Sequence, residues 1–205
     1  MSAKILWIDL ETTGTSPIRH GITQLAAIVE IDGQVVEEVD LKMRPLTKHD
    51  IEPEALEKTG RTEDEIWGFP HSSEQYAVFI ALLERYVNRY DKLDKFVLAG
   101  YNICAFDEPF LREFFMDNAA TRKDREANGW FGSWFFWPKR DAQTYLAEHI
   151  SEHSLRLPNY RLETVCGHFG IPIDAHDALS DIKATRTLYQ VLRYSLITAP
   201  ASQAA

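Results

Sequence analysis

The amino-acid sequence predicts an α/β fold whose sheet begins with antiparallel strands. Two long runs, residues 22–31 and 34–43, flank an Asp32-Gly33 pair, and this dipeptide is typical of the tight turn of a β-hairpin. A short apolar run at 5–10 precedes them, and another at 96–102 follows with helical patterns after it. Strands that alternate with helices favour an α/β arrangement. We therefore expect a meander of three strands, followed by strands that helices separate.

The first strand ends in two acidic residues, Asp9 and Glu11. Alternate residues of a strand share a face. The two faces hold Ile5, Trp7, Asp9 and Glu11 on one side, and Leu6, Ile8 and Leu10 on the other. Apolar residues on both faces indicate a strand near the middle of a sheet. Two carboxylates roughly 7 Å apart repel each other, and a hard divalent cation between them would relieve the repulsion. The alternative is that the strand has left the core and water solvates both acids.

Helical signals follow the meander. A short helix is expected at 54–59. Thr62 and Glu65 have the spacing of a capping box, and Ser72 and Gln75 repeat that spacing before a longer helix. The stripe of this longer helix indicates core packing rather than a ligand site. It consists of Tyr76, Phe79, Ile80, Leu83, Val87 and Tyr90.

The second half of the chain predicts further helices and one more strand. Asp107 precedes a helix with an aromatic face that includes Phe110 and Phe114. Residues 119–132 are polar and contain glycine, which is typical of a long loop. The aromatic stretch 133–139 is expected to form a strand. Three later helices are expected at 142–149, 161–169 and 178 to about 194.

Composition limits the classes of function that fit the chain. Its 205 residues are 45% hydrophobic, which suits one globular domain at 1–197 with a flexible tail at 198–205. The formal net charge of −9 excludes nucleic-acid binding by bulk electrostatics, so any affinity for phosphate must be local. Cys104 and Cys166 lie in no CxxC pair, which favours reduced thiols in the cytoplasm. No apolar run approaches the ~20 residues of a membrane span.

Three other polar residues become informative in combination. Asp107 lies where a buried strand leads into a helix, where it would act either as a helix cap or as a ligand. Asp177 and Asp181 are four residues apart at the start of the last helix, and the spacing alone does not choose between them. His176 stands just ahead of that helix, where a lone histidine is more often structural than catalytic.

Together these segments resemble the three motifs of the DEDDh exonucleases, a family that includes proofreading epsilon subunits, RNase T, oligoribonuclease and exonuclease I. The motifs are Asp9-Leu10-Glu11-Thr12-Thr13-Gly14, then Gly100-Tyr101-Asn102 running to Phe106-Asp107, then His176-Asp177-Ala178-Leu179-Ser180-Asp181. Each motif alone is weak, whereas the three in order are strong, and they span roughly residues 4 to 193. The chain looks most like the nuclease domain of exonuclease I. It lacks the accessory domains that enclose the strand there, so we do not expect high processivity.

The resemblance implies an RNase H-like fold, with a five-stranded mixed sheet of three antiparallel strands and then parallel ones, flanked by helices. It also implies that Asp9, Glu11, Asp107 and Asp181 are metal ligands and that His176 is the general base. Two Mg²⁺ or Mn²⁺ ions about 3.5–4 Å apart suit phosphodiester hydrolysis. Asp9 would bridge them, Glu11 and Asp181 would support the first, and Asp107 the second.

Substrate contacts follow from the same motifs and from nearby aromatic and basic residues. Trp130, Trp134 and Trp137 would either stack bases of a single strand or pack on the sheet. Lys139, Arg140 and Arg161 are candidate phosphate contacts. The predicted substrate-binding set is Thr12, Thr13, Gly14, Tyr101, Asn102, Phe106, Trp134 and Arg140.

The implied function is a 3′-to-5′ exonuclease that releases nucleoside monophosphates from single-stranded nucleic acid, DNA more than RNA. We expect a cytoplasmic monomer or homodimer that does not act on membranes and that contributes to DNA repair. The first alternative is an RNA 3′-end trimming enzyme of the RNase T or oligoribonuclease kind. Epsilon-like proofreading in trans is a weaker alternative. A further alternative, a non-catalytic RNase H-like binding module, would be expected to have lost one of the five motif residues.

Overall fold

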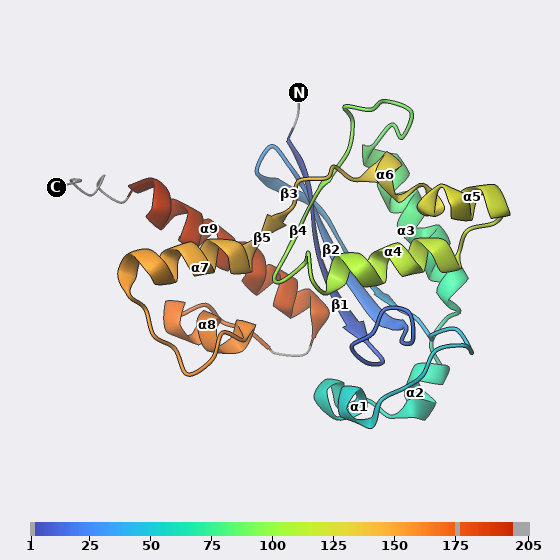
Figure 1. Cartoon of the computed structure of the whole chain (residues 1–205), viewed down its shortest axis with the longest axis horizontal. Coiled ribbons are helices and arrows are strands. Elements are labelled where there is room, and N and C mark those ends of the chain that lie inside the picture. Colours follow the sequence, from blue (N-terminus) through green and yellow to red (C-terminus); the bar gives the residue numbers. More distant parts are fainter. Residues whose placement is uncertain (1–2, 175–176, 199–205) are drawn as a thin grey trace.

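The computed structural model describes residues 3–174 and 177–198. A five-stranded mixed sheet runs through its centre in the order β3-β2-β1-β4-β5 (Figure 1). β1 pairs antiparallel with β2, β2 antiparallel with β3, and β1-β4-β5 are parallel, which confirms the predicted RNase H-like sheet. The strands are β1 (Lys4–Thr12), β2 (Ile22–Ile31), β3 (Gln34–Lys42), β4 (Val97–Gly100) and β5 (Arg140–Asp141).

Helices cover both faces of the sheet. In Figure 1, α7, α8 and α9 lie on one side, and α3, α4, α5 and α6 lie on the other. The helices are α1 (Pro53–Thr59), α2 (Glu63–Trp67), α3 (Ser72–Tyr86), α4 (Asp107–Asp117), α5 (Arg122–Glu126), α6 (Phe131–Trp134), α7 (Ala142–His153), α8 (Leu162–Phe169) and α9 (Ala178–Thr198), with a 3₁₀ turn η1 (Asn128–Trp130). Within the described ranges, no helix has the length and apolarity that crossing a bilayer requires.

β1 is the central strand, and its two faces divide as the alternation predicts. Leu6, Ile8 and Leu10 enter the larger core cluster, which also contains the aromatic side chains of α3 and α4. Ile5 and Trp7 enter a second cluster with residues of α9. The Trp7 ring meets the Tyr189 ring edge-on with centroids 5.2 Å apart. The face of β1 that carries the two acids therefore looks toward α9.

The predicted hairpin turn and the first predicted capping box are confirmed, whereas the second capping box is not. The β2–β3 hairpin turns at Asp32 and Gly33, whose φ angles of 50° and 86° suit a tight turn that glycine adopts without strain. Thr62 and Glu65 form the capping box of α2. The expected box at Ser72 is wrong. α3 begins at Ser72 itself, and the side chain of His71 accepts the hydrogen bond from the Ser73 amide.

The predictions for residues 119–139 are wrong. The expected loop contains the short helix α5 and the turn η1, and the expected strand at 133–139 is replaced by α6 and an irregular segment. Only an isolated bridge, Phe96 to Phe135, and the two residues of β5 continue the sheet there. The physical reason is packing. The Phe131 and Phe135 rings, 4.7 Å apart, pack in the core with Phe115, and a helical turn brings them together.

The helix boundaries elsewhere follow the sequence closely, with three exceptions. α7 and α9 extend beyond the expected ends at residues 149 and 194. α3 ends at Tyr86, before the last two residues of its predicted stripe; Val87 is still buried, but Tyr90 is 83% exposed, so its predicted core packing is wrong. The inward residues predicted for α9 are buried; they are Ile182, Thr185, Leu188, Tyr189 and Leu192. In the predicted tail, residues 199–205 lie outside the described residues.

Candidate active site

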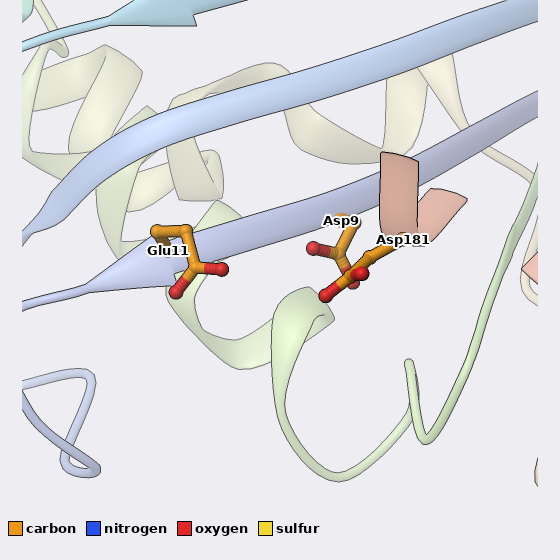
Figure 2. Close-up of side chains that lie close together, drawn as sticks. All are labelled: Asp9, Glu11 and Asp181. Atoms are coloured by element: carbon orange, nitrogen blue, oxygen red, sulfur yellow. The ribbon is translucent and has the colours of Figure 1, made fainter. Parts of the chain in front are cut away.

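Three carboxylates from two elements meet at the C-terminal half of β1. Asp9 and Glu11 project from β1, and Asp181 projects from the first turn of α9. Each offers an oxygen atom, and these three atoms lie within 4.8 Å of one another. Figure 2 shows Asp181 reaching from α9 to the acidic side chains of β1. Segments that are 170 residues apart in the sequence thus form one acidic cluster.

Asp107 is a fourth acid beside this cluster. It is the first residue of α4, and the N-cap of that helix is Phe106, so Asp107 is not the cap. Its side chain is only 3% exposed, and its Oδ1 accepts a hydrogen bond of 3.1 Å from the backbone amide of Leu10. Because Leu10 directly follows Asp9, this bond holds Asp107 next to β1.

The electrostatics of the cluster disfavour the charged forms of these acids. Burial, followed by the charges of Asp107 and Asp181, raises the pKa of Asp9 well above its usual value. Burial and the charge of Asp181 raise the pKa of Glu11 to about 7, although the Arg61 guanidinium opposes this. Burial raises the pKa of Asp107 to about 8, against the lowering effect of its backbone hydrogen bonds. A site that holds these three acids, and Asp181 beside them, gains from a bound cation.

The donor set fits a hard divalent ion. The ligand atoms on offer are carboxylate oxygens, which Mg²⁺ and Mn²⁺ prefer over the nitrogen and sulfur ligands of softer metals. Asp9, Glu11 and Asp181 are placed to share one ion, and Asp107 lies beside Asp9.

The structure distinguishes Asp181 from Asp177. The Asp177 side chain accepts a 3.0 Å hydrogen bond from the Ser180 amide and so caps the start of α9. Asp181 lies one turn later, within the acidic cluster. His176 lies outside the described residues, so its role as a general base stays a prediction.

The turn that follows Glu11 is held by a dense set of contacts. The Thr12 hydroxyl donates to the Gly14 carbonyl at 2.7 Å, and the Thr13 hydroxyl donates to the Asp50 carbonyl at 2.6 Å. The buried His20 ring packs so closely against Gly14 that a Cβ there would lie 2.5 Å from its Nδ1 atom. Glycine is therefore required at position 14, and the turn Thr12–Gly14 is rigid.

A cleft of about 480 Å³ opens beside the acids. It brings together most of the predicted second motif with the acids of β1 and α4. Asn102 takes the left-handed conformation in the loop between β4 and α4, with a φ of 58°. The lining residues are Asp9, Leu10, Glu11, Tyr101, Asn102, Phe106, Asp107, Gln143, Tyr160 and Arg161.

One organising residue of this cleft, Asp141, was not predicted. Its carboxylate accepts hydrogen bonds from the amides of Asn102 at 2.9 Å, Gln143 at 3.0 Å and Cys104 at 3.4 Å. It therefore caps α7 and holds the loop after β4 at the same time. An acidic residue directly before a predicted helix was the available signal, but the sequence does not show that the same side chain reaches a loop 39 residues earlier.

Five of the predicted substrate contacts do not line this cleft: Thr12, Thr13 and Gly14 are buried in the turn after Glu11, and Trp134 and Arg140 lie elsewhere. Trp134 is 1% exposed and packs within the larger core cluster, so the prediction that it stacks on bases is wrong. Arg140 is half-buried in β5, where its guanidinium lies 6.0 Å from the centre of the Tyr189 ring, and it does not line the cleft. Both were proposed because aromatic and basic residues gather near 130–140, and this pattern alone does not reveal which side chains turn inward.

Comparisons with known proteins agree with this geometry. Residues 6–125 match the RNase T family model, whose description is exonuclease. Exonuclease I from Methylocaldum szegediense, a moderately thermophilic enzyme, is 26% identical with a TM-score of 0.70; the match covers 97% of this chain and 41% of that one. Escherichia coli exonuclease I in complex with a dT13 oligonucleotide is 24% identical with a TM-score of 0.71, covering 94% of this chain and 41% of that one.

The E. coli enzyme with a dA16 oligonucleotide is 25% identical with a TM-score of 0.70, and the match covers 96% of this chain and 43% of that one. The chain thus spans about two fifths of the length of these structures. No curated protein matches it. Since the family model covers more than half of the chain, and the four acids that the family motifs require converge beside one cleft, the chain belongs to the RNase T exonuclease family.

Proposed function

We propose that the protein is a metal-dependent 3′-to-5′ exonuclease that releases nucleoside monophosphates from single-stranded DNA. The observation that carries the proposal is the convergence of Asp9, Glu11 and Asp181 within 4.8 Å, with Asp107 held against the same strand. A cluster of this kind has no evident use in stabilising the fold, since burial and mutual repulsion oppose the ionised forms.

The four acids would hold two divalent ions, Mg²⁺ or Mn²⁺. When bound, such ions supply Lewis acidity toward the phosphoryl oxygens and lower the pKa of a coordinated water. The role of the protein chain is to hold the ligand side chains in position. β1 sets the spacing of Asp9 and Glu11, the bond from the Leu10 amide orients Asp107, and the cap at Asp177 fixes the first turn of α9 and with it Asp181.

The proton from the attacking water requires an acceptor, and we propose His176 for this role from its place in the third motif. An imidazole with an ordinary pKa of about 6.5 suits a base that works near neutral pH. Loss of a general base typically slows a reaction by ~10²–10⁴-fold and leaves residual turnover. His176→Ala should therefore keep a trace of the activity that Asp9→Ala abolishes.

Selection for a free 3′ end would come from the cleft and its two rigid borders. One is the loop from Tyr101 to Phe106, which lines the cleft and which Asp141 anchors. The other is the buried turn Thr12–Gly14, which directly follows Glu11 and would contact the terminal sugar only through its backbone. A cleft of about 480 Å³ is in the range of small-ligand sites and suits one terminal nucleotide.

DNA is the proposed substrate because two of the similar solved structures are complexes of exonuclease I with DNA oligonucleotides. Cys104 and Cys166 are both free, which supports a reducing compartment such as the cytoplasm. There, a single-strand exonuclease, as a monomer or homodimer, would serve in DNA repair.

A labelled-substrate assay tests this function. The protein and its Asp9→Ala variant are incubated with Mg²⁺ and 5′-labelled single-stranded DNA, duplex DNA or RNA, each with and without a 3′ block. A ladder of shortened 5′-labelled products from single-stranded DNA that the block suppresses, and that Asp9→Ala does not make, is the expected result. Internal cuts in the blocked strand, or equal activity of Asp9→Ala, would contradict it. Faster loss of RNA than of DNA would make the chain an RNA-trimming enzyme instead.

A further inference from the structure

Trp137 is the most exposed of the tryptophans that line or border the cavities of the described residues. It is 84% exposed, whereas Trp134 is 1% exposed and Trp130 is 38% exposed; Tyr90, at 83%, is comparably exposed but lies away from the acids. The Trp130 indole also donates a 2.7 Å hydrogen bond to Asp124. Leaving an indole in water forfeits the free energy of burying it, so the fold gains nothing from this placement.

The backbone beneath Trp137 is nevertheless held firmly. The ammonium of Lys139, whose side chain is 5% exposed, donates to the carbonyls of Phe136 at 2.7 Å and Trp137 at 2.8 Å. The same ammonium lies 5.7 Å from the centre of the Trp137 ring. Pro138 follows and restricts the chain further. An exposed ring on a fixed backbone loses little freedom when a second flat ring stacks on it.

Trp137 lines a second cavity of about 640 Å³, several of whose other lining residues alternate in sequence with those of the catalytic cleft. The two cavities are lined by neighbouring residues of the same two segments. Residues 101, 102, 106 and 107 and residue 143 line the cleft. Cys104, Glu108, Asp141 and Tyr145 line the second cavity. A chain that leaves the cleft across the loop before α4 and the start of α7 therefore enters the second cavity and reaches Trp137.

The charges in the second cavity permit a phosphate chain to pass. Glu108 is shared by Arg112, which donates to it at 3.0 Å, and by the ammonium of Lys139 at 3.5 Å. Asp141 is engaged by backbone amides. The two cations, Arg112 and Lys139, offset the two carboxylates, so the charged lining of this cavity is neutral overall although the formal net charge of the chain is −9.

We propose that Trp137 is a stacking platform for single-stranded DNA, and that the cavity between it and the cleft carries the strand on the 5′ side of the nucleotide being removed. This inference rests on the proposed exonuclease function and adds the path of the substrate. Stacking of a base on an aromatic ring contributes ~1–3 kcal/mol, which corresponds to a change in affinity of about 5- to 150-fold. The platform acts only on strands long enough to span from the cleft to Trp137.

The test compares a thymidine decamer with a thymidine dinucleotide, each labelled at its 5′ end, by fluorescence anisotropy with Ca²⁺ in place of Mg²⁺. Trp137→Ala should weaken binding of the decamer by about 5- to 150-fold and leave the dinucleotide unchanged. Trp137→Phe should restore most of the affinity. Trp130→Ala is the matched control and should bind both strands as the parent does, because its ring lies outside the second cavity.

Equal decamer affinity of Trp137→Ala and the parent would overturn the platform, as would an equal loss for the dinucleotide. So would sedimentation showing that the parent is a dimer and Trp137→Ala a monomer, because the ring would then serve as a protein interface. Degradation by the parent distinguishes the two proposals. If the parent binds the decamer through Trp137 but does not shorten it, the stacking proposal stands and the exonuclease proposal fails.

Discussion

The acidic cluster on β1 and the aromatic core packed against the opposite face of the same strand are ordered by opposite forces. Leu6, Ile8 and Leu10 are buried with the rings of α3 and α4, and burial stabilises them. Asp9 and Glu11 lie two residues apart on the other face, where both are partly buried, and this desolvation raises the pKa of both. The core-facing side of β1 therefore stabilises the fold throughout, whereas the other side stabilises it only through Ile5 and Trp7 and carries an electrostatic cost at its acidic end that a bound cation would offset. Substitutions on the two faces should separate activity from stability.

Removal of a metal ligand should give the largest effect. Asp9→Asn should lower the rate of nucleotide release by at least ~10⁴-fold, because it removes an oxygen ligand shared by both proposed ions. Its melting temperature without metal should equal or exceed that of the parent, since one buried charge is gone. Asp177→Asn is the matched control and should remain active, as it keeps an oxygen that can cap α9. A melting temperature far below the parent's would mean that Asp9 stabilises the fold.

A substitution on the core side should show the converse pattern. Phe115 is fully buried and meets the rings of Tyr76, Phe131 and Phe135. Phe115→Ala should lower the free energy of unfolding by ~3–5 kcal/mol through lost burial and a cavity. Urea denaturation measures this change. Below the melting temperature, the activity per folded molecule should match that of the parent, and a large loss of that activity would show that the two faces are coupled.

The pH dependence of protein stability in the absence of metal should show that the acidic side of β1 carries the electrostatic cost. Folded-state pKa values raised to about 7 for Glu11 and about 8 for Asp107 mean that the folded state binds more protons than the unfolded state between pH ~4 and ~8. The contribution of these two acids to the free energy of unfolding is therefore fully present below pH ~4 and is lost as the pH rises through this window. In EDTA, thermal scans should show a melting temperature that decreases from pH 5 to pH 8.

Addition of Mn²⁺ should reverse this loss, and the rise in melting temperature should be larger at pH 8 than at pH 5, because only ionised carboxylates bind the metal. Asp9→Asn should flatten both trends. A metal-free melting temperature that rises between pH 5 and pH 8 would contradict the assignment of strain to these acids.

The loop after β4 should show a smaller effect. Asp141→Ala removes the acceptor for the amides of Asn102, Cys104 and Gln143, so the border of the cleft loses its anchor. Misplacement on the scale of 1 Å can slow a reaction by ~10²-fold, and we expect a loss of up to this size in kcat/KM for single-stranded DNA. Glu148→Ala, at an exposed position on the same helix outside both cavities, is the control and should match the parent. Equal rates for both variants would show that the loop is held without Asp141.

The same contrast explains what the sequence could predict. The three-stranded meander and the acids were accessible because strand alternation and the Asp32-Gly33 turn are local signals, and the Asp9–Glu11 pair marks the end of a strand directly. The five-stranded mixed sheet and the choice of Asp181 followed from the resemblance of the three motifs to a known family. Residues 119–139 were mispredicted because their structure depends on contacts with Phe115 and Phe96, far away in the sequence. The burial of Trp134 and the reach of Asp141 to Asn102 are tertiary facts of the same kind.

Anomalous diffraction from crystals soaked with Mn²⁺ would locate the ions themselves. We expect one anomalous peak among the oxygens of Asp9, Glu11 and Asp181, and a second, with a nucleoside monophosphate bound, between Asp9 and Asp107. Crystals of Asp9→Asn should lose both peaks. Saturating Mn²⁺ that gives no peak beside Asp9, with the four acids still in the positions described, would contradict the account.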